Sequence, residues 1–164
     1  MIIDLKPIFV NDNSSLPIDY ALDMTDFELS GLFPLKNPVK INGLVYNKAS
    51  LIRLEATITY VYDAPCDRCG DNAVEEITVK LEKSLAVSIE GEESDTIIAL
   101  PDMKLDLDDL VYTETVLSIP TKHLCSATCK GICYKCGKNL NQGKCECPEK
   151  EIDPRLQALA DLLK

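Results

Sequence analysis

Alternating apolar and polar positions run through the middle of the chain. In residues 51–62 every second position is apolar, namely Leu54, Ala56, Ile58, Tyr60 and Tyr62, with Arg53, Glu55, Thr57 and Thr59 between them. A period of two is typical of a strand with one buried face. Residues 74–90 repeat the alternation with Ile77, Val79, Leu81, Leu85, Val87 and Ile89. Lys83 interrupts this second apolar face, which predicts a bulge or a strand break there.

The segment between these two strands, DAPCDRCGDN, is rich in turn-forming residues. It predicts a long antiparallel hairpin with Cys66 and Cys69 at its tip. Residues 38–47 add a further strand-like pattern, in which the Asn42-Gly43 pair indicates either a hairpin turn or a bulge. Residues 1–10 are expected to form a strand.

Two segments have helical patterns. In residues 104–120, Asp106 is a suitable N-cap, Leu110, Val111 and Leu117 form an apolar stripe, and Pro120 ends the helix. In the last residues, Asp153 is the expected cap and Pro154 the first helical position, and one face carries Leu156, Leu159, Ala160 and Leu163. This second helix could pack on its own protein or bind a partner.

These elements predict an α+β fold: an antiparallel β-rich body, either a sheet or a small barrel, with one or two helices and a cysteine-rich module. We expect a β-rich domain in residues 1–120, a cysteine-rich module in residues 121–150, and an amphipathic helix in residues 151–164.

Charge divides the chain in the same way. The 164 residues carry a formal net charge of −10. Residues 1–120 hold nine Lys and Arg against 22 Asp and Glu, a charge of −13, whereas residues 121–150 hold six Lys against two Glu, a charge of +4. An acidic body opposes broad attraction to nucleic acid or to an anionic membrane surface. With no apolar run of membrane-spanning length and no signal-like start, the sequence predicts a cytoplasmic protein with reduced thiols and no membrane partner.

The eight cysteines fall into four close pairs: Cys66 with Cys69, Cys125 with Cys129, Cys133 with Cys136, and Cys145 with Cys147. Two pairs have the pattern Cys-x2-Cys-Gly, in which the glycine is Gly70 or Gly137. Glycine tolerates the positive φ that a metal knuckle can require. Eight thiolates complete two tetrahedral sites, so two zinc ions are the expected cofactors. Redox catalysis by a dithiol and an iron–sulfur cluster are the alternatives, and a cluster would colour the protein brown.

Spacing favours one partition of these ligands. Cys133, Cys136, Cys145 and Cys147 are contiguous, which leaves Cys125 and Cys129 to meet Cys66 and Cys69 across the fold, although alternating pairs remain open. Residues 121–150 contain few apolar side chains, so we expect them to form a zinc-binding ribbon or knuckle module whose folding requires the metal. His123, the single histidine, is either a bystander or a substitute ligand.

No motif for catalysis accompanies the cysteines. The sequence has one histidine, no glycine-rich phosphate loop and no His-paired nucleophile. Two closed four-cysteine sites would also lack the open position of a catalytic zinc. We therefore expect a binding protein with no small-molecule substrate, not an enzyme.

The order of these parts resembles the YceD-like family of large ribosomal RNA subunit accumulation proteins. The resemblance rests on CDRCG, then LDLDDLVYTETVLSIP, then CSATCKGICYKCGKNLNQGKCEC, then IDPRLQALADLL, and it covers roughly residues 50–164. It implies a non-catalytic factor, bacterial or organellar, that supports normal levels of large-subunit ribosomal RNA. A general zinc-dependent interaction module, for example one linked to transcription, is the alternative.

The charge division suggests two kinds of partner. Ribosomal RNA could contact Lys130, Lys135, Lys138 and Lys144 in the basic module, at a few phosphates only. A basic large-subunit ribosomal protein would suit the acidic body.

Overall fold

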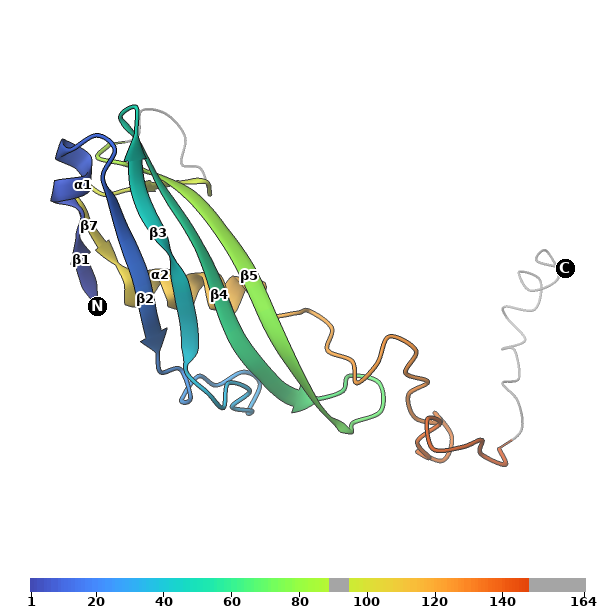
Figure 1. Ribbon diagram of the computed structural model, residues 1–164. Helices are drawn as coiled ribbons and strands as arrows, with labels where there is room; N and C mark the ends of the chain where they lie inside the picture. Colours follow the sequence, from blue (N-terminus) through green and yellow to red (C-terminus); the bar gives the residue numbers. More distant parts are fainter. Residues whose placement is uncertain (89–94, 148–164) are drawn as a thin grey trace, which may run out of the picture.

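The computed structural model describes residues 1–88 and 95–147, and it shows a five-stranded sheet with a helix across one face (Figure 1). The strand order is β2-β3-β4-β5-β6, antiparallel except between β5 and β6. The strands are β2 (Ser15–Leu22), β3 (Val39–Lys48), β4 (Leu51–Pro65), β5 (Asn72–Ala86) and β6 (Ile97–Ala99). A separate pair joins β1 (Ile2–Asp4) to β7 (Lys104–Asp106). The helices are α1 (Lys6–Val10) and α2 (Leu107–Ser118). The expected α+β class is confirmed, with an open sheet as its body.

The long β4–β5 hairpin confirms the first alternating segment and most of the second, but Val87 lies beyond the end of β5 and is 42% exposed. All five apolar positions expected on the inner face of β4, from Leu54 to Tyr62, are buried. Together with Leu81 and Leu85 of β5 and Leu107 and Val111 of α2, they belong to one apolar core. The sheet and the helix thus form the two layers that such a face requires. Ile89 of the expected pattern lies outside the described residues.

The bulge or break expected at Lys83 is wrong. Pairing between β4 and β5 continues without interruption through Leu54 and Lys83. The Lys83 ammonium lies 2.7 Å from the Glu114 carboxylate of α2 and donates to the Asp95 carbonyl oxygen. An ion pair between the two layers therefore lets a lysine occupy the inward position of a regular strand.

Asn42-Gly43 is neither a turn nor a bulge, because β3 runs straight through it. A Cβ atom at Gly43 would lie 2.3 Å from the Glu55 carbonyl oxygen and 2.5 Å from the Cβ atom of Ala56. Glycine is needed here because the neighbouring strand approaches closely.

The first ten residues do not form the single strand expected. β1 ends at Asp4, and α1 begins at Lys6 with Pro7 in its first turn. Proline cannot donate in a strand ladder but fits a helix start, and the Asp4 carboxylate accepts from the Lys6 backbone N–H at 2.9 Å.

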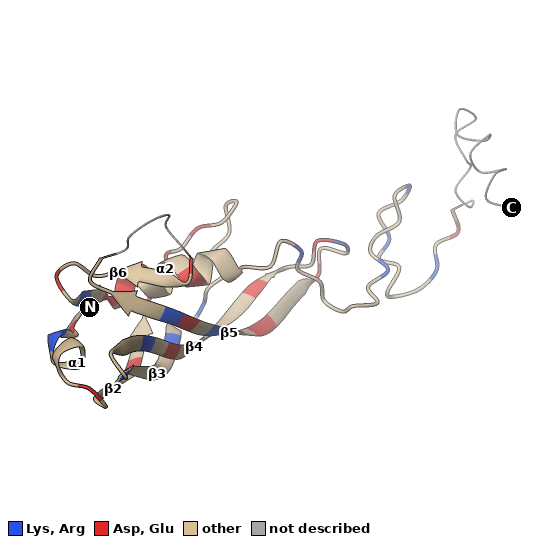
Figure 2. Ribbon diagram, turned by 90° about the horizontal axis from the view of Figure 1, so that it is seen from above, with Lys and Arg blue, Asp and Glu red and all other residues tan. Residues whose placement is uncertain are grey.

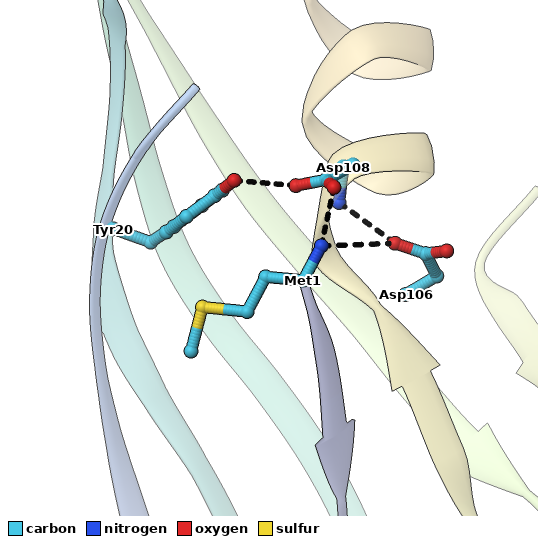
Figure 3. Close-up of polar contacts among 4 residues, drawn as sticks. All are labelled: Met1, Tyr20, Asp106 and Asp108. Carbon is cyan, nitrogen blue, oxygen red and sulfur yellow. Dashed lines mark hydrogen bonds and ion pairs between the residues drawn. The ribbon is translucent and has the colours of Figure 1, made fainter. Parts of the chain in front are cut away.

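The helix α2 confirms the expected cap, since the Asp106 side chain accepts from the Asp108 backbone N–H. Its buried positions are Leu107, Leu110, Val111 and Thr115, whereas Leu117 is exposed and does not belong to the apolar stripe as expected. Asp108, in the first turn, accepts hydrogen bonds from the Tyr20 hydroxyl of β2 and from the Met1 amino group (Figure 3). These contacts fasten the helix start to β1 and β2.

The amphipathic helix expected in residues 151–164 lies outside the described residues. Among the described helices, neither is long and apolar enough to cross a membrane.

Candidate metal centres

The structure gathers the eight cysteines into two groups of four. Cys66, Cys69, Cys125 and Cys129 form the first group, and Cys133, Cys136, Cys145 and Cys147 form the second. Within each group all sulfur atoms lie within 4.8 Å of one another. The two groups match the partition favoured by spacing, and either could bind a metal ion.

The two Cys-x2-Cys-Gly turns share one backbone geometry. At the hairpin tip, the Cys66 N–H donates to the Asp71 carbonyl oxygen at 2.8 Å, and the Gly70 N–H donates to the Cys66 carbonyl oxygen at 2.9 Å. In the second group, Cys133 donates to Lys138 and Gly137 donates to Cys133, both at 2.8 Å. The φ angles are +75° at Gly70 and +72° at Gly137, in the left-handed region that favours glycine. Each turn brings two sulfurs to one side of the chain.

The sulfur separations of the first group fit a tetrahedral ion. Cys66 Sγ lies 3.8 Å from Cys129 Sγ, and Cys69 Sγ lies 3.6 Å from Cys125 Sγ. Metal–sulfur bonds of about 2.3 Å in a tetrahedron place neighbouring sulfurs about 3.8 Å apart. A disulfide would require about 2.05 Å, and all eight cysteines are free thiols. The donor set therefore suits a soft, four-coordinate cation.

The pKa values of the thiols show why these groups would favour a cation. Backbone N–H groups, that of Cys125 foremost, lower the pKa of the Cys66 thiol to about 6. The backbone N–H of Cys136 and then that of Lys135 lower the pKa of Cys133 to about 6 as well. The thiol of Cys125 hydrogen-bonds to the sulfurs of Cys129 and Cys69, which raises its pKa to about 12. Some sulfurs are thus ready thiolates while a neighbour retains its proton, and a divalent cation could replace that proton.

Hydrogen bonds fasten the hairpin tip to the cysteine-rich segment, here defined as residues 121–147. Arg68 Nη1 donates to the Cys129 carbonyl oxygen at 2.8 Å, and the Ile132 N–H donates to the Arg68 carbonyl oxygen at 3.1 Å. The Asn139 amide donates to the Asp71 carboxylate at 2.6 Å. The first group therefore joins two parts of the chain that also contact each other directly.

Gly131 explains how the two parts approach so closely. Its φ is +74°, and a Cβ atom there would lie 3.0 Å from the Arg68 carbonyl oxygen. A larger residue would strain the turn that leads from the first cysteine group to the second.

His123 is placed beside the first group but does not belong to it. Its Nε2 hydrogen-bonds with the Ala73 carbonyl oxygen at 3.0 Å, and its ring meets Tyr62 edge to face at 5.0 Å. The Asp67 N–H donates to the His123 carbonyl oxygen, and the His123 N–H donates to the Asp67 carboxylate. This buried ring packs the segment against β4 and β5, which agrees with a bystander and not with a substitute ligand.

The four lysines expected to contact RNA are all exposed. Lys130 and Lys144 line a hollow of about 300 Å³ with Leu140, Asn141 and Gly143. Lys138 Nζ donates to the Lys144 carbonyl oxygen at 3.0 Å. Lys135 Nζ lies 5.8 Å from the ring centre of Tyr134.

Sequence reasoning missed Tyr134 as a candidate contact residue. Its side chain is 65% exposed between cysteines of the second group. The signal that could have found it is an aromatic residue next to a lysine in a turn with no apolar neighbours to bury it.

Comparison with known proteins follows from these motifs. The family model of the large ribosomal RNA subunit accumulation protein YceD matches residues 54–163. The chain belongs to this family. The match includes β4 from Leu54 onward, the strands β5 to β7, α2 and both cysteine groups, so the resemblance stated from the motifs is confirmed.

The chain is also similar to large ribosomal RNA subunit accumulation protein YCED homolog 1, chloroplastic, of Arabidopsis thaliana. The two are 26% identical over an alignment of 162 residues. The match covers 79% of this chain and 50% of that protein. The chain thus spans about half the length of this curated relative. No solved structure matches the present chain.

Proposed function

We propose that this protein is a non-catalytic zinc-binding factor that supports accumulation of large-subunit ribosomal RNA. The observation that carries the proposal is the pair of four-cysteine groups in a chain of the YceD family. The eight cysteines are the proposed ligands of two zinc ions. The proposed location is the cytoplasm of a bacterial-type cell, with the plastid as the alternative suggested by the relative's name.

Zinc suits these sites better than iron or redox chemistry. The first Cys-x2-Cys turn connects β4 to β5, and the second lies in a turn outside the strands. Neither is at the start of a helix, where a redox dithiol is found. Four thiolates with no further donor close the coordination shell, as in structural zinc sites. Two such sites would take the formal net charge from −10 to about −14, because each carries a net −2.

This charge limits how the protein could contact RNA. In Figure 2, acidic and basic residues are both distributed over the body, where the acidic residues are in excess, while lysines follow the extended cysteine-rich segment. We infer that RNA contacts are confined to this segment, through Lys130, Lys135, Lys138 and Lys144, with Tyr134 available to stack on a base. The acidic body would face away from RNA and suits a basic large-subunit ribosomal protein.

Metal analysis tests the cofactor. Anaerobically purified protein should contain two equivalents of zinc by native mass spectrometry and should be colourless. One equivalent or none, or bound iron, would overturn the cofactor assignment.

The RNA surface can be tested with a matched pair of variants. Lys130→Gln, Lys135→Gln and Lys138→Gln together should flatten the slope of log affinity for large-subunit RNA against log salt, by about 0.7–0.9 per lost contact. The control replaces Lys40, Lys48 and Lys80, all exposed on the body, with Gln. Equal effects of the two triple variants would contradict a segment-specific RNA surface.

The cellular role is tested by depletion. The ratio of large-subunit to small-subunit ribosomal RNA should fall when the protein is depleted, and the protein should sediment with large-subunit precursors. An unchanged ratio without such co-sedimentation would favour the alternative, a general zinc-dependent interaction module.

A further inference from the structure

A groove on the acidic body runs from the start of α2 to the first cysteine group, whose Cys66 lines its far end. It consists of two adjacent hollows of about 580 and 540 Å³ between α2 and the loop of residues 22–33, and Phe27 lines both. The second hollow continues along Val116 and Ile119 to the hairpin tip. Each hollow is large enough to hold several side chains of a partner.

The apolar part of the groove is held in a fixed shape. Leu29 and Leu32 exchange backbone hydrogen bonds of 2.8 and 3.0 Å across a tight turn, with positive φ at Ser30 and Gly31. Positive φ at both central residues is the geometry of a type I′ turn. The two leucines are nevertheless 37% and 45% exposed. Apolar side chains gathered around a hollow typically mark a contact surface.

An aromatic pair lines the groove, with Phe27 in both hollows and Tyr112 in the first. The rings of Phe27 and Tyr112 meet edge to face, with centroids 6.1 Å apart. Tyr112 is 48% exposed, so about half of its side chain is accessible to a ligand. An exposed aromatic face attracts lysine and arginine side chains as well as apolar ones.

The charged side chains that line the groove are all acidic among the described residues. Asp23, Asp26, Glu28, Asp108 and Asp109 line the first hollow, and Asp67 lines the second. No Lys or Arg lines either hollow among the described residues. An RNA backbone would be repelled here, whereas a cationic chain would be attracted.

We propose that this groove binds an extended basic segment of a protein, in which lysine or arginine side chains face the carboxylates and a bulky apolar side chain enters beside Leu29 and Leu32. The inference deepens the proposed function, because it gives the acidic body its own class of partner. Peptide binding by the groove requires neither RNA nor the lysines of the cysteine-rich segment. The groove proposal and the proposed RNA contacts can therefore be disproved separately.

Binding of synthetic peptides tests the proposal. The probe is a short fluorescent peptide with several Arg and Lys around a central Leu-Phe pair, titrated by anisotropy with the full-length zinc-loaded protein at about 0.05 and 0.15 M salt. Binding should weaken at the higher salt. Peptide binding should weaken about tenfold or more when the basic residues are replaced with Gln, and also when the Leu-Phe pair is replaced with Ser.

Matched variants locate the site. Asp26→Lys with Glu28→Lys should weaken peptide binding about tenfold, and Tyr112→Ala should weaken it several-fold. Glu76→Lys with Glu82→Lys makes the same change of charge on exposed positions of β5 outside the groove, and it should alter binding less than about twofold. Unchanged circular dichroism of each variant excludes unfolding as the cause.

Three results would overturn the proposal. The first is an equal loss of binding in the two charge-reversal variants, which would mean general attraction between opposite charges. The second is unchanged binding of the Ser-substituted peptide. The third is no binding of the original peptide. Concentration-dependent dimerisation that the groove variants abolish would assign the groove to a second copy of this chain.

Discussion

Leu54, Ile58 and Val111 are fully buried in the sheet body, whereas Ile132 and Tyr134 of the cysteine-rich segment are more than half exposed. The body has a continuous apolar core between the sheet and α2. The segment contributes only Cys129 and the partly buried Leu124 to a small cluster with Cys66, Cys69 and Ala73. Burial of apolar area can stabilise the first region by itself, but it cannot offset the entropy of ordering the second.

Removal of the metal ions should therefore produce the largest difference in stability between the two regions. A structural zinc site can contribute on the order of 10–16 kcal/mol to folding, which nothing else in residues 121–147 can replace. We expect a strong chelator to abolish hydrogen-exchange protection in residues 121–147 and to lower it, without abolishing it, in β2 to β5. Loss of protection across the whole sheet would contradict this comparison. Leu54→Ala is the opposite control, since it should cost about 2–5 kcal/mol in the body and leave zinc content unchanged.

Single cysteine substitutions should divide the segment further. Cys66 lies at the tip of the β4–β5 hairpin, and its group joins that hairpin to residues 125–129. Cys66→Ser should therefore destabilise the sheet body together with the segment. Cys147→Ser should affect mainly residues 130–147, because its group is contiguous in the sequence. Hydrogen exchange that shows the reverse pattern would reject the partition.

The comparison also shows what could be predicted from the sequence. The strands β4 and β5 and the two Cys-x2-Cys turns depend on neighbouring residues, so alternation and spacing were sufficient to predict them. The role of Lys83 depends on Glu114, a residue of another layer, and alternation within one strand cannot reveal such a partner. The groove depends on residues 22–33 meeting α2, and the sequence contains no local signal for that meeting.

Short elements were missed for a different reason. The helix α1 has five residues and β6 has three, so neither is long enough to show a hydrophobic period. Pro7 was the available signal for a helix start within residues 1–10.

The Lys83–Glu114 ion pair offers a sharper test of the body, with a smaller effect. Both side chains are only 16–17% exposed, between the surface and fully buried cases. Lys83→Met should lower the free energy of unfolding by about 2 kcal/mol, because the Glu114 carboxylate loses its partner in a partly buried position. Adding Glu114→Leu should restore most of the loss, since an apolar pair needs no such compensation.

Lys80→Met is the matched control for this pair. Lys80 is exposed on the same strand, and its replacement should change stability by less than about 0.5 kcal/mol. Urea unfolding of the four proteins measures these differences. Equal losses from Lys83→Met and Lys80→Met would show that the ion pair contributes nothing.

The contact of Asp108 with Tyr20 should give the smallest effect, one that depends on pH. Hydrogen bonds from the Met1 amino group and then from the Tyr20 hydroxyl lower the pKa of Asp108 in the folded protein. A carboxylate with a lowered pKa stabilises the fold above its unfolded pKa of about 3.9, and the stabilisation is lost as the pH falls through the folded value. Asp108→Asn should thus lower the melting temperature at pH 7 by more than at pH 3. Asp109→Asn, in the same helix turn but without these hydrogen bonds, is the control and should show no such convergence. A difference between Asp108→Asn and the unmodified protein that is constant from pH 7 to pH 3 would mean that the carboxylate charge does not hold α2 to β2.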